Sequence, residues 1–156
     1  GRRMSDWLDA ARGRFDFLRR VAELHGCTVR VGTWSAEDWL GGAVAEEKRI
    51  FINMEQSMGE AAVRWLVENH GESRGVDAEA CEWVIRSWCI LHELGHVLLG
   101  HGRDNDMMAL YEAQANLFAR RVLIALLEDH GISEQGAAAL CGRIAQDMTT
   151  APAEAH

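Results

Sequence analysis

The sequence lacks a hydrophobic run long enough to cross a membrane, and no charged and then apolar signal segment opens it. The longest apolar run towards the C-terminal half, Val122 to Leu127, is far shorter than the ~20 residues that a transmembrane helix needs. In the absence of a span or a signal segment, we expect a cytoplasmic protein that does not enter a membrane.

The sequence also lacks a cluster of Lys and Arg with interleaved aromatic residues. It has 16 Lys and Arg against 24 Asp and Glu, which gives a formal net charge of −8. Domains that bind nucleic acid usually carry a basic stripe, so we expect no direct contact with DNA or RNA. A basic protein partner is compatible with this charge, although an acidic surface mainly favours solubility.

No Cys-x-x-Cys pair is present among the four cysteines, which are Cys27, Cys81, Cys89 and Cys141. Cys81 and Cys89 fall on one predicted helix, too far apart to form a disulfide with each other. We therefore expect buried, reduced thiols. Cys89 lies one helical turn before His92 and could reach a metal there, but core packing is the favoured interpretation.

What the sequence does contain is an ordinary globular composition, with 48% hydrophobic and 26% charged residues over 156 positions. This length predicts one domain with one core. We place that domain at residues 1–148 and expect a disordered tail over 149–156. The order of the elements predicts an α+β fold, a mostly helical single domain with a small sheet of about three strands.

Capping residues and apolar periodicity locate the individual elements. Ser57 and Glu60 form a capping-box pattern at the start of one helix. The second half of the 78–100 helix is apolar nearly all round, which predicts a buried central helix. We expect helices from a cap at Ser5 or Asp6 to about residue 25, from 57 to about 70, from 78 to 100, from a cap at Asp104 or Asp106 to about 130, and from 133 to about 148, with strands at 27–34, 42–45 and 49–53.

The central motif is His92-Glu93-Leu94-Gly95-His96, set within the otherwise apolar run from Trp88 to Gly100. A buried carboxylate without partners costs several kcal/mol or shifts its pKa until it is neutral, and a bound cation would remove that cost. His92 and His96 share one face of a helix, so both can direct a ring nitrogen at one ion. Glu93 lies beside that face, within reach of a water molecule at the ion. The pattern is the zinc-peptidase signature, with two histidine ligands and a glutamate as general base.

Glu112 is the expected third ligand. It opens the segment Glu112-Ala113-Gln114-Ala115-Asn116 on the next predicted helix, which has room to return antiparallel beside the first. Asn116, one turn further, could hydrogen-bond the rear nitrogen of a ligand histidine and fix its tautomer. The alternative for Glu112 is a solvated glutamate near a helix start, where the helix dipole favours a negative charge.

His101 is the rival third ligand. In the metzincin pattern a glycine follows three residues after the second histidine and a further histidine three residues later. Here those positions hold Leu99 and Gly102, so the register does not fit and His101 is better placed near the mouth of the cleft. A further hydrogen-bond donor for the oxyanion of peptide hydrolysis is also needed. Tyr111, His101 and Arg103 are candidates between which the sequence does not choose.

Three blocks of the sequence resemble the ImmA/IrrE family of zinc metallopeptidases. They are Ile50-Phe51-Ile52-Asn53, the segment from Leu91 to Leu99, and the segment from Glu112 to Leu123. The resemblance implies a gluzincin-like fold, with a helix bundle, a small sheet and two active-site helices. It also implies one Zn²⁺ per chain with His92, His96 and Glu112 as ligands, and Glu93 as the catalytic residue.

The resemblance further implies a zinc-dependent peptidase that acts on a protein substrate. Members of this family are similar to regulatory proteases that cleave repressor-type transcription factors. The segment from Gly59 to Ala80 looks longer than usual for the family, which leaves the substrate open. One alternative is a zinc-containing module without catalytic activity that binds a repressor or an antitoxin. Another is a metal-free helical interaction protein.

Overall fold

A computed structural model of the chain describes residues 4–36, 39–55, 57–70, 78–101, 105–128 and 139. Its helices are α1 (Met4–Leu24), α2 (Gly59–His70), α3 (Ala78–Leu98) and α4 (Met108–Glu128), its strands are β1 (Thr28–Gly32), β2 (Gly41–Val44) and β3 (Arg49–Asn53), and two short 3-10 helices are η1 (Ala45–Glu47) and η2 (Asn105–Met107). The predicted α+β class, mostly helical with a small sheet, is confirmed. No helix in this described part is long and apolar enough to span a membrane.

The bounds of the elements differ from the predicted ones mainly at β1. This strand ends at Gly32, where it pairs with Asn53, the last residue of β3. Beyond that point the side chain of Asn53 holds the chain instead, with Oδ1 accepting from the Trp34 amide and Nδ2 donating to the Trp39 carbonyl. The predicted helix over 133–148 and the predicted tail over 149–156 lie outside the described residues, apart from residue 139.

The sheet has the strand order β1-β3-β2, with β1 parallel and β2 antiparallel to the central β3. Successive side chains of a strand point to opposite faces. Ile50 and Ile52 of β3 accordingly belong to the main core, whereas Phe51 packs with Trp34 and Trp39 in a separate aromatic cluster. The sheet therefore presents one apolar face to the helices, and Trp34 and Trp39 cover part of the other.

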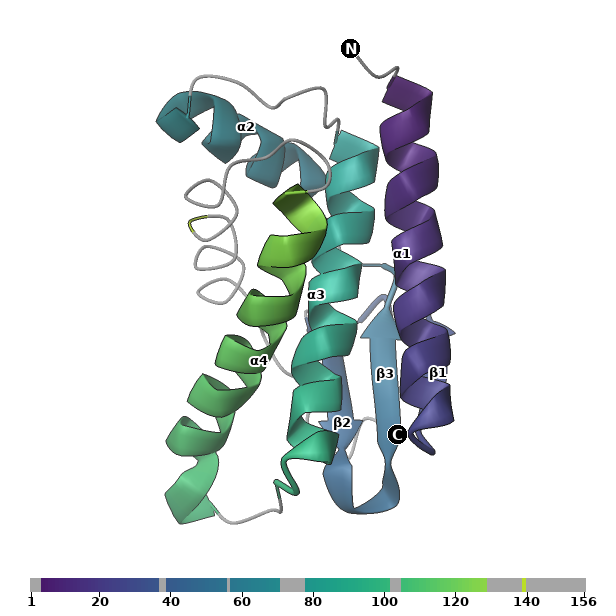
Figure 1. The fold of residues 1–156 in the computed structure, drawn as a ribbon, viewed down its shortest axis with the longest axis vertical. Coiled ribbons are helices and arrows are strands. Elements are labelled where there is room, and N and C mark those ends of the chain that lie inside the picture. The colour runs from purple at the N-terminus through teal and green to yellow at the C-terminus, as the bar shows by residue number, and fades with distance from the viewer. Residues whose placement is uncertain are drawn as a thin grey trace.

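Helix α3 is the centre of the molecule (Figure 1). It packs against α1, α2, α4 and the sheet, and its residues from Ala80 to His96 are buried except at three positions. The all-round apolar character of its second half is what allows this burial. The predicted central helix is confirmed, and it carries His92, Glu93 and His96 into the interior.

A carboxylate of α3 caps the start of α2. Glu82 Oε1 accepts hydrogen bonds from the Ser57 hydroxyl at 3.0 Å and from the backbone amides of Met58 and Gly59. These amides belong to the first turn of α2, where no partner exists within the helix. The predicted capping box does not form, because Ser57 contacts Glu82 and the exposed Glu60 takes no part.

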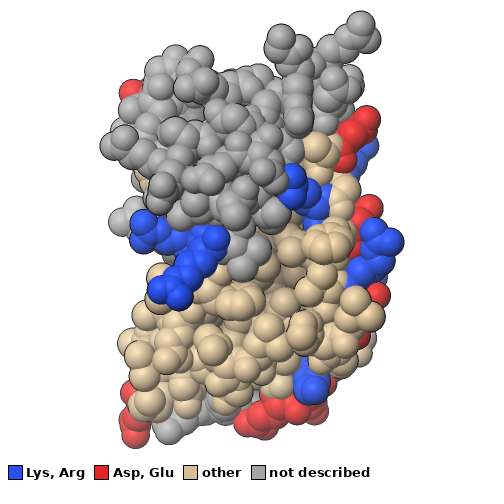
Figure 2. Space-filling view, in the orientation of Figure 1, with Lys and Arg blue, Asp and Glu red and all other residues tan. Residues whose placement is uncertain are grey.

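Figure 2 shows that the surface over the lower ends of α3 and α4 is largely uncharged, with acidic side chains along its lower edge. Several large apolar side chains near the connection between these helices are exposed, namely Leu98, Leu99, Met107, Met108 and Leu110. This end of the described molecule therefore presents an apolar surface to solvent.

Candidate metal centre

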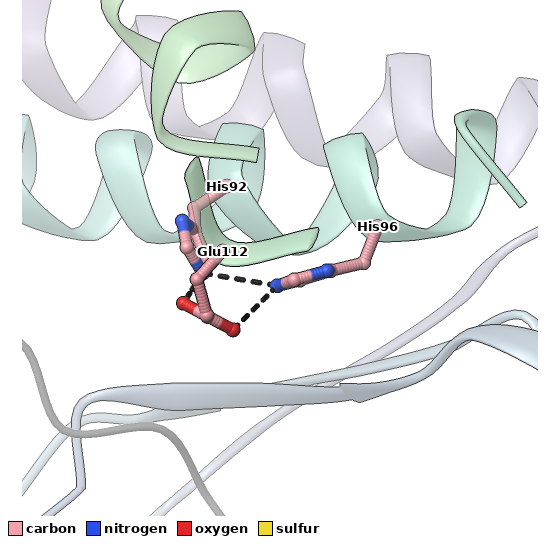
Figure 3. A group of neighbouring side chains, drawn as sticks. All are labelled: His92, His96 and Glu112. Carbon is pink, nitrogen blue, oxygen red and sulfur yellow. Dashed lines mark hydrogen bonds and ion pairs between the residues drawn. The ribbon is translucent and has the colours of Figure 1, made fainter. Parts of the chain in front are cut away.

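Three side chains from two helices point toward one another (Figure 3). His92 Nε2 lies 3.1 Å from Glu112 Oε2, and His96 Nε2 lies 3.0 Å from Glu112 Oε1. The two Nε2 atoms are 3.1 Å apart. Both histidines are buried, whereas the Glu112 side chain is 34% exposed. The group is therefore accessible to solvent from the side of Glu112.

The local sequence explains why these helices come so close. His92 and His96 are four residues apart on α3, and α4 returns beside it with Glu112 facing them. A Cβ atom at Gly95 would lie 3.3 Å from Ala115 Cα and 3.2 Å from Phe118 Cδ1, which is tighter than ordinary contact. Small residues at Gly95 and Ala115 thus permit the close approach that brings the ligand atoms together.

The three residues fit a metal ion. Ligand atoms about 2.0–2.1 Å from a tetrahedral zinc ion lie about 3.3 Å from one another. The observed separations of 3.0 Å to 3.1 Å are only slightly smaller. Two imidazoles and one carboxylate are also the donor set of many catalytic zinc sites, which keep a further position open. His92, His96 and Glu112 could therefore hold a metal ion.

Glu112 is held in its charged form. Burial disfavours the carboxylate, but hydrogen bonds from His92 and His96 and the charges of these rings outweigh burial and lower the pKa of Glu112 to about 2. A carboxylate that stays ionised over the physiological range is what a metal ligand requires.

Glu93 shows the opposite behaviour. Its side chain is fully buried, and neither carboxylate oxygen has a hydrogen-bond partner within the described part of the chain. Oε1 lies 3.7 Å from His92 Nε2, which places the carboxyl group next to the three converging side chains. Burial raises the pKa of Glu93 to about 8, against an opposing influence of His96. An orphaned buried carboxylate is costly, and a cation beside it would remove much of that cost.

His101 lies behind His96 rather than among the ligand atoms. Its Nδ1 is 2.8 Å from His96 Nδ1, and its Nε2 is 2.7 Å from Gln114 Oε1. Its ring stacks on Tyr111, with centroids 4.3 Å apart. Burial lowers the pKa of His101, although the hydrogen bond to Gln114 opposes this. Both ring nitrogens are engaged, so neither is free for a metal ion or an oxyanion.

The end of α3 explains this position of His101. Gly100 has a left-handed backbone with φ of 70°, the His101 amide donates to the His96 carbonyl, and the Gly100 amide donates to the Val97 carbonyl. These two bonds define a Schellman motif, which brings the residue after the glycine back over the last full turn of the helix. The motif therefore places His101 against His96.

None of the remaining predicted residues that the structure describes belongs to the group of converging ligand atoms. Asn116 does not support a ligand histidine, because its Oδ1 and the Nδ1 of His92 are both buried without a partner in the described residues, and His96 Nδ1 is paired with His101. Cys89 is buried in the core, and burial raises the pKa of its thiol. Arg103 lies outside the described residues.

Two contacts of His101 were not predicted from the sequence, one with His96 and one with Gln114. Gln114 was expected only as part of the segment around Glu112, yet it bonds to His101. The available signal was Gly100 followed by His101, since a glycine just past a helix predicts the Schellman closure.

No comparison with protein-family models, with curated proteins or with solved structures gave a match.

Proposed function

We propose that this protein is a zinc-dependent metallopeptidase that hydrolyses a peptide bond in a protein substrate. His92, His96 and Glu112 would hold one zinc ion, since two imidazoles and a carboxylate suit zinc better than the all-oxygen sites preferred by calcium or magnesium. The observation that carries the proposal is Glu93, a buried carboxylate beside this group that has no hydrogen-bond partner among the described residues. A metal that only stabilised the fold would need no such base.

When bound, zinc supplies a Lewis acid that polarises the scissile carbonyl and makes a water molecule more acidic. Glu93 accepts a proton from the attacking water and later delivers it to the leaving amine. Its raised pKa suits the second step. A cation held by His92, His96 and Glu112 would lower the pKa of Glu93 enough for the first. Glu112 would remain a carboxylate throughout, because a metal ligand is bound in its deprotonated form.

The oxyanion of the reaction needs a further hydrogen-bond donor. His101 is a poor choice because both of its ring nitrogens are engaged. Tyr111, which stacks on His101, and Arg103 remain the proposed candidates. The resemblance to ImmA/IrrE peptidases favours a repressor-type regulator as the substrate, and the exposed apolar surface at the connection between α3 and α4 suits a polypeptide.

The test uses the zinc-loaded parent and a Glu93→Gln variant, incubated with a synthetic peptide library and with purified repressor-type regulators. Cleavage is read by mass spectrometry. We expect the parent to cut and the variant to bind zinc without cutting. Zinc binding with no cleavage by the parent, combined with equal binding of a regulator by both proteins, would instead establish a binding module without catalytic activity.

A further inference from the structure

We infer that His101 and Gln114 form a hydrogen-bond relay that fixes the tautomer and the ring orientation of His96 for metal binding. The inference rests on the proposed function, because it assigns His96 as a ligand. In it, His101 and Gln114 are positioning residues that act through His96 and touch neither the metal ion nor the substrate.

The relay is a continuous line of short contacts. His96 Nδ1 lies 2.8 Å from His101 Nδ1, and His101 Nε2 lies 2.7 Å from Gln114 Oε1. His96 and His101 are buried, and the Tyr111 ring stacked on His101 limits rotation of that ring. Gln114 is exposed and forms the outer end of the line. Every ring nitrogen of His101 thus has one partner.

Donors and acceptors can be assigned along this line in one direction. A neutral imidazole that binds a metal through Nε2 keeps its proton on Nδ1. His96 Nδ1 then donates to His101 Nδ1, which must be the unprotonated nitrogen of its own ring. His101 therefore carries its proton on Nε2 and donates it to Gln114 Oε1, an amide oxygen that can only accept.

The two ligand histidines differ in this respect. His92 Nδ1 is buried and has no partner in the described part of the chain, although the Trp88 ring stacks on His92 with centroids 5.0 Å apart. His92 is therefore oriented by packing, whereas His96 is oriented by hydrogen bonds. Ligand histidines usually donate their rear N–H to a partner that fixes the ring and raises its basicity. His101 fills that place for His96.

The first experiment measures zinc affinity by competition with a chromophoric chelator for the parent and for three variants. Gln114→Met removes the acceptor while nearly keeping the shape of the side chain, and Gln114→Glu keeps an acceptor. His101→Phe removes both ring nitrogens and keeps the aromatic stack on Tyr111. Loss of such a partner typically weakens metal binding about 10–100-fold. We expect that loss for His101→Phe, about a tenfold loss for Gln114→Met, and parental affinity for Gln114→Glu.

The second experiment reads the tautomers directly, by long-range ¹H–¹⁵N correlation spectra of the histidine rings in the zinc-loaded protein. The relay predicts a protonated Nδ1 on His96 and a protonated Nε2 on His101. Equal zinc affinities of Gln114→Met and Gln114→Glu, or a proton on His101 Nδ1, would overturn the relay while leaving the zinc site intact. A parent protein that binds no zinc would overturn the proposed function, and the relay with it.

Discussion

Two buried glutamates on α3, about three helical turns apart, occupy opposite environments. Glu82 accepts hydrogen bonds from the Ser57 hydroxyl and from two backbone amides at the start of α2, and the Arg86 guanidinium lies 3.7 Å from its second oxygen. Glu93 is more deeply buried, and neither of its oxygens has a partner in the described residues.

Both carboxylates are buried, but within the described residues they differ in the donors around them. Donors fixed by the fold hold Glu82 and join α2 to α3. No donor in the described part of the chain pairs with Glu93, and in the proposed function this leaves it able to take up and release a proton. In the proposed function, the carboxylate at one end of α3 stabilises the fold, and the one at the other end takes part in catalysis.

The largest effect should come from Glu93→Gln. Loss of a general base typically lowers the rate about 10²–10⁴-fold, so we expect kcat for peptide cleavage to fall by that factor while zinc binding is kept. Glu82→Gln is the matched control, since it also replaces a buried carboxylate of α3, and it should retain kcat per folded molecule. Equal losses of kcat in the two variants would contradict the proposal that Glu93 is catalytic and Glu82 is structural.

The unfolding free energy of the metal-free protein should depend on pH through Glu93. Its pKa in the folded state is about 8, above the ordinary value of 4.5. The unfolded chain therefore releases this proton more easily, and the contribution of Glu93 to stability is complete below pH 4.5 and is lost as the pH rises through about 8. Each unit of pKa difference corresponds to about 1.4 kcal/mol.

Urea unfolding followed by tryptophan fluorescence at several pH values measures this effect. Glu93→Gln has no proton to lose and should show a flatter profile between pH 4.5 and 8. Glu112, with a pKa of about 2, acts with the opposite sign and only below this window. Parallel profiles for the parent and Glu93→Gln would contradict the assignment.

Glu82→Ala should lower the unfolding free energy by roughly 3 kcal/mol, because the amides of Met58 and Gly59 would lose a charged acceptor. Urea unfolding gives the value, and Glu82→Gln should lose less because it keeps one oxygen. Zinc content per folded chain should stay at the parental level in both variants. A clearly lower zinc content per folded chain in either variant would show that the two ends of α3 are coupled.

A smaller effect is expected for Gly95→Ala. The added Cβ would meet Ala115 Cα at 3.3 Å, so α4 must move by a few tenths of an ångström and carry Glu112 with it. We expect a loss of stability of about 1–2 kcal/mol and a several-fold weaker affinity for zinc. Gly13→Ala on α1 is the control, because nothing lies within 4 Å of its Cβ. Unchanged zinc affinity in Gly95→Ala would mean that helix spacing does not set the ligand geometry.

The spacing of His92 and His96 on one helix was sufficient to predict their convergence, because helical geometry is local. Glu112 followed from an antiparallel return of the next helix, which the small residues Gly95 and Ala115 permit. The capping role of Glu82 could not be predicted, since it depends on where α2 starts against α3, and Ser57 is far away in the sequence. His101 was expected near the mouth of a cleft, whereas the backbone closure at Gly100 buries it against His96.

The most direct test of the account is the zinc content of the purified protein, measured for the parent, for Glu112→Ala and for Glu82→Ala. We expect about one zinc ion per chain in the parent and in Glu82→Ala, and little or none in Glu112→Ala. The same full zinc content in Glu112→Ala as in the parent, or no zinc in the parent after zinc is added, would contradict a site built from His92, His96 and Glu112.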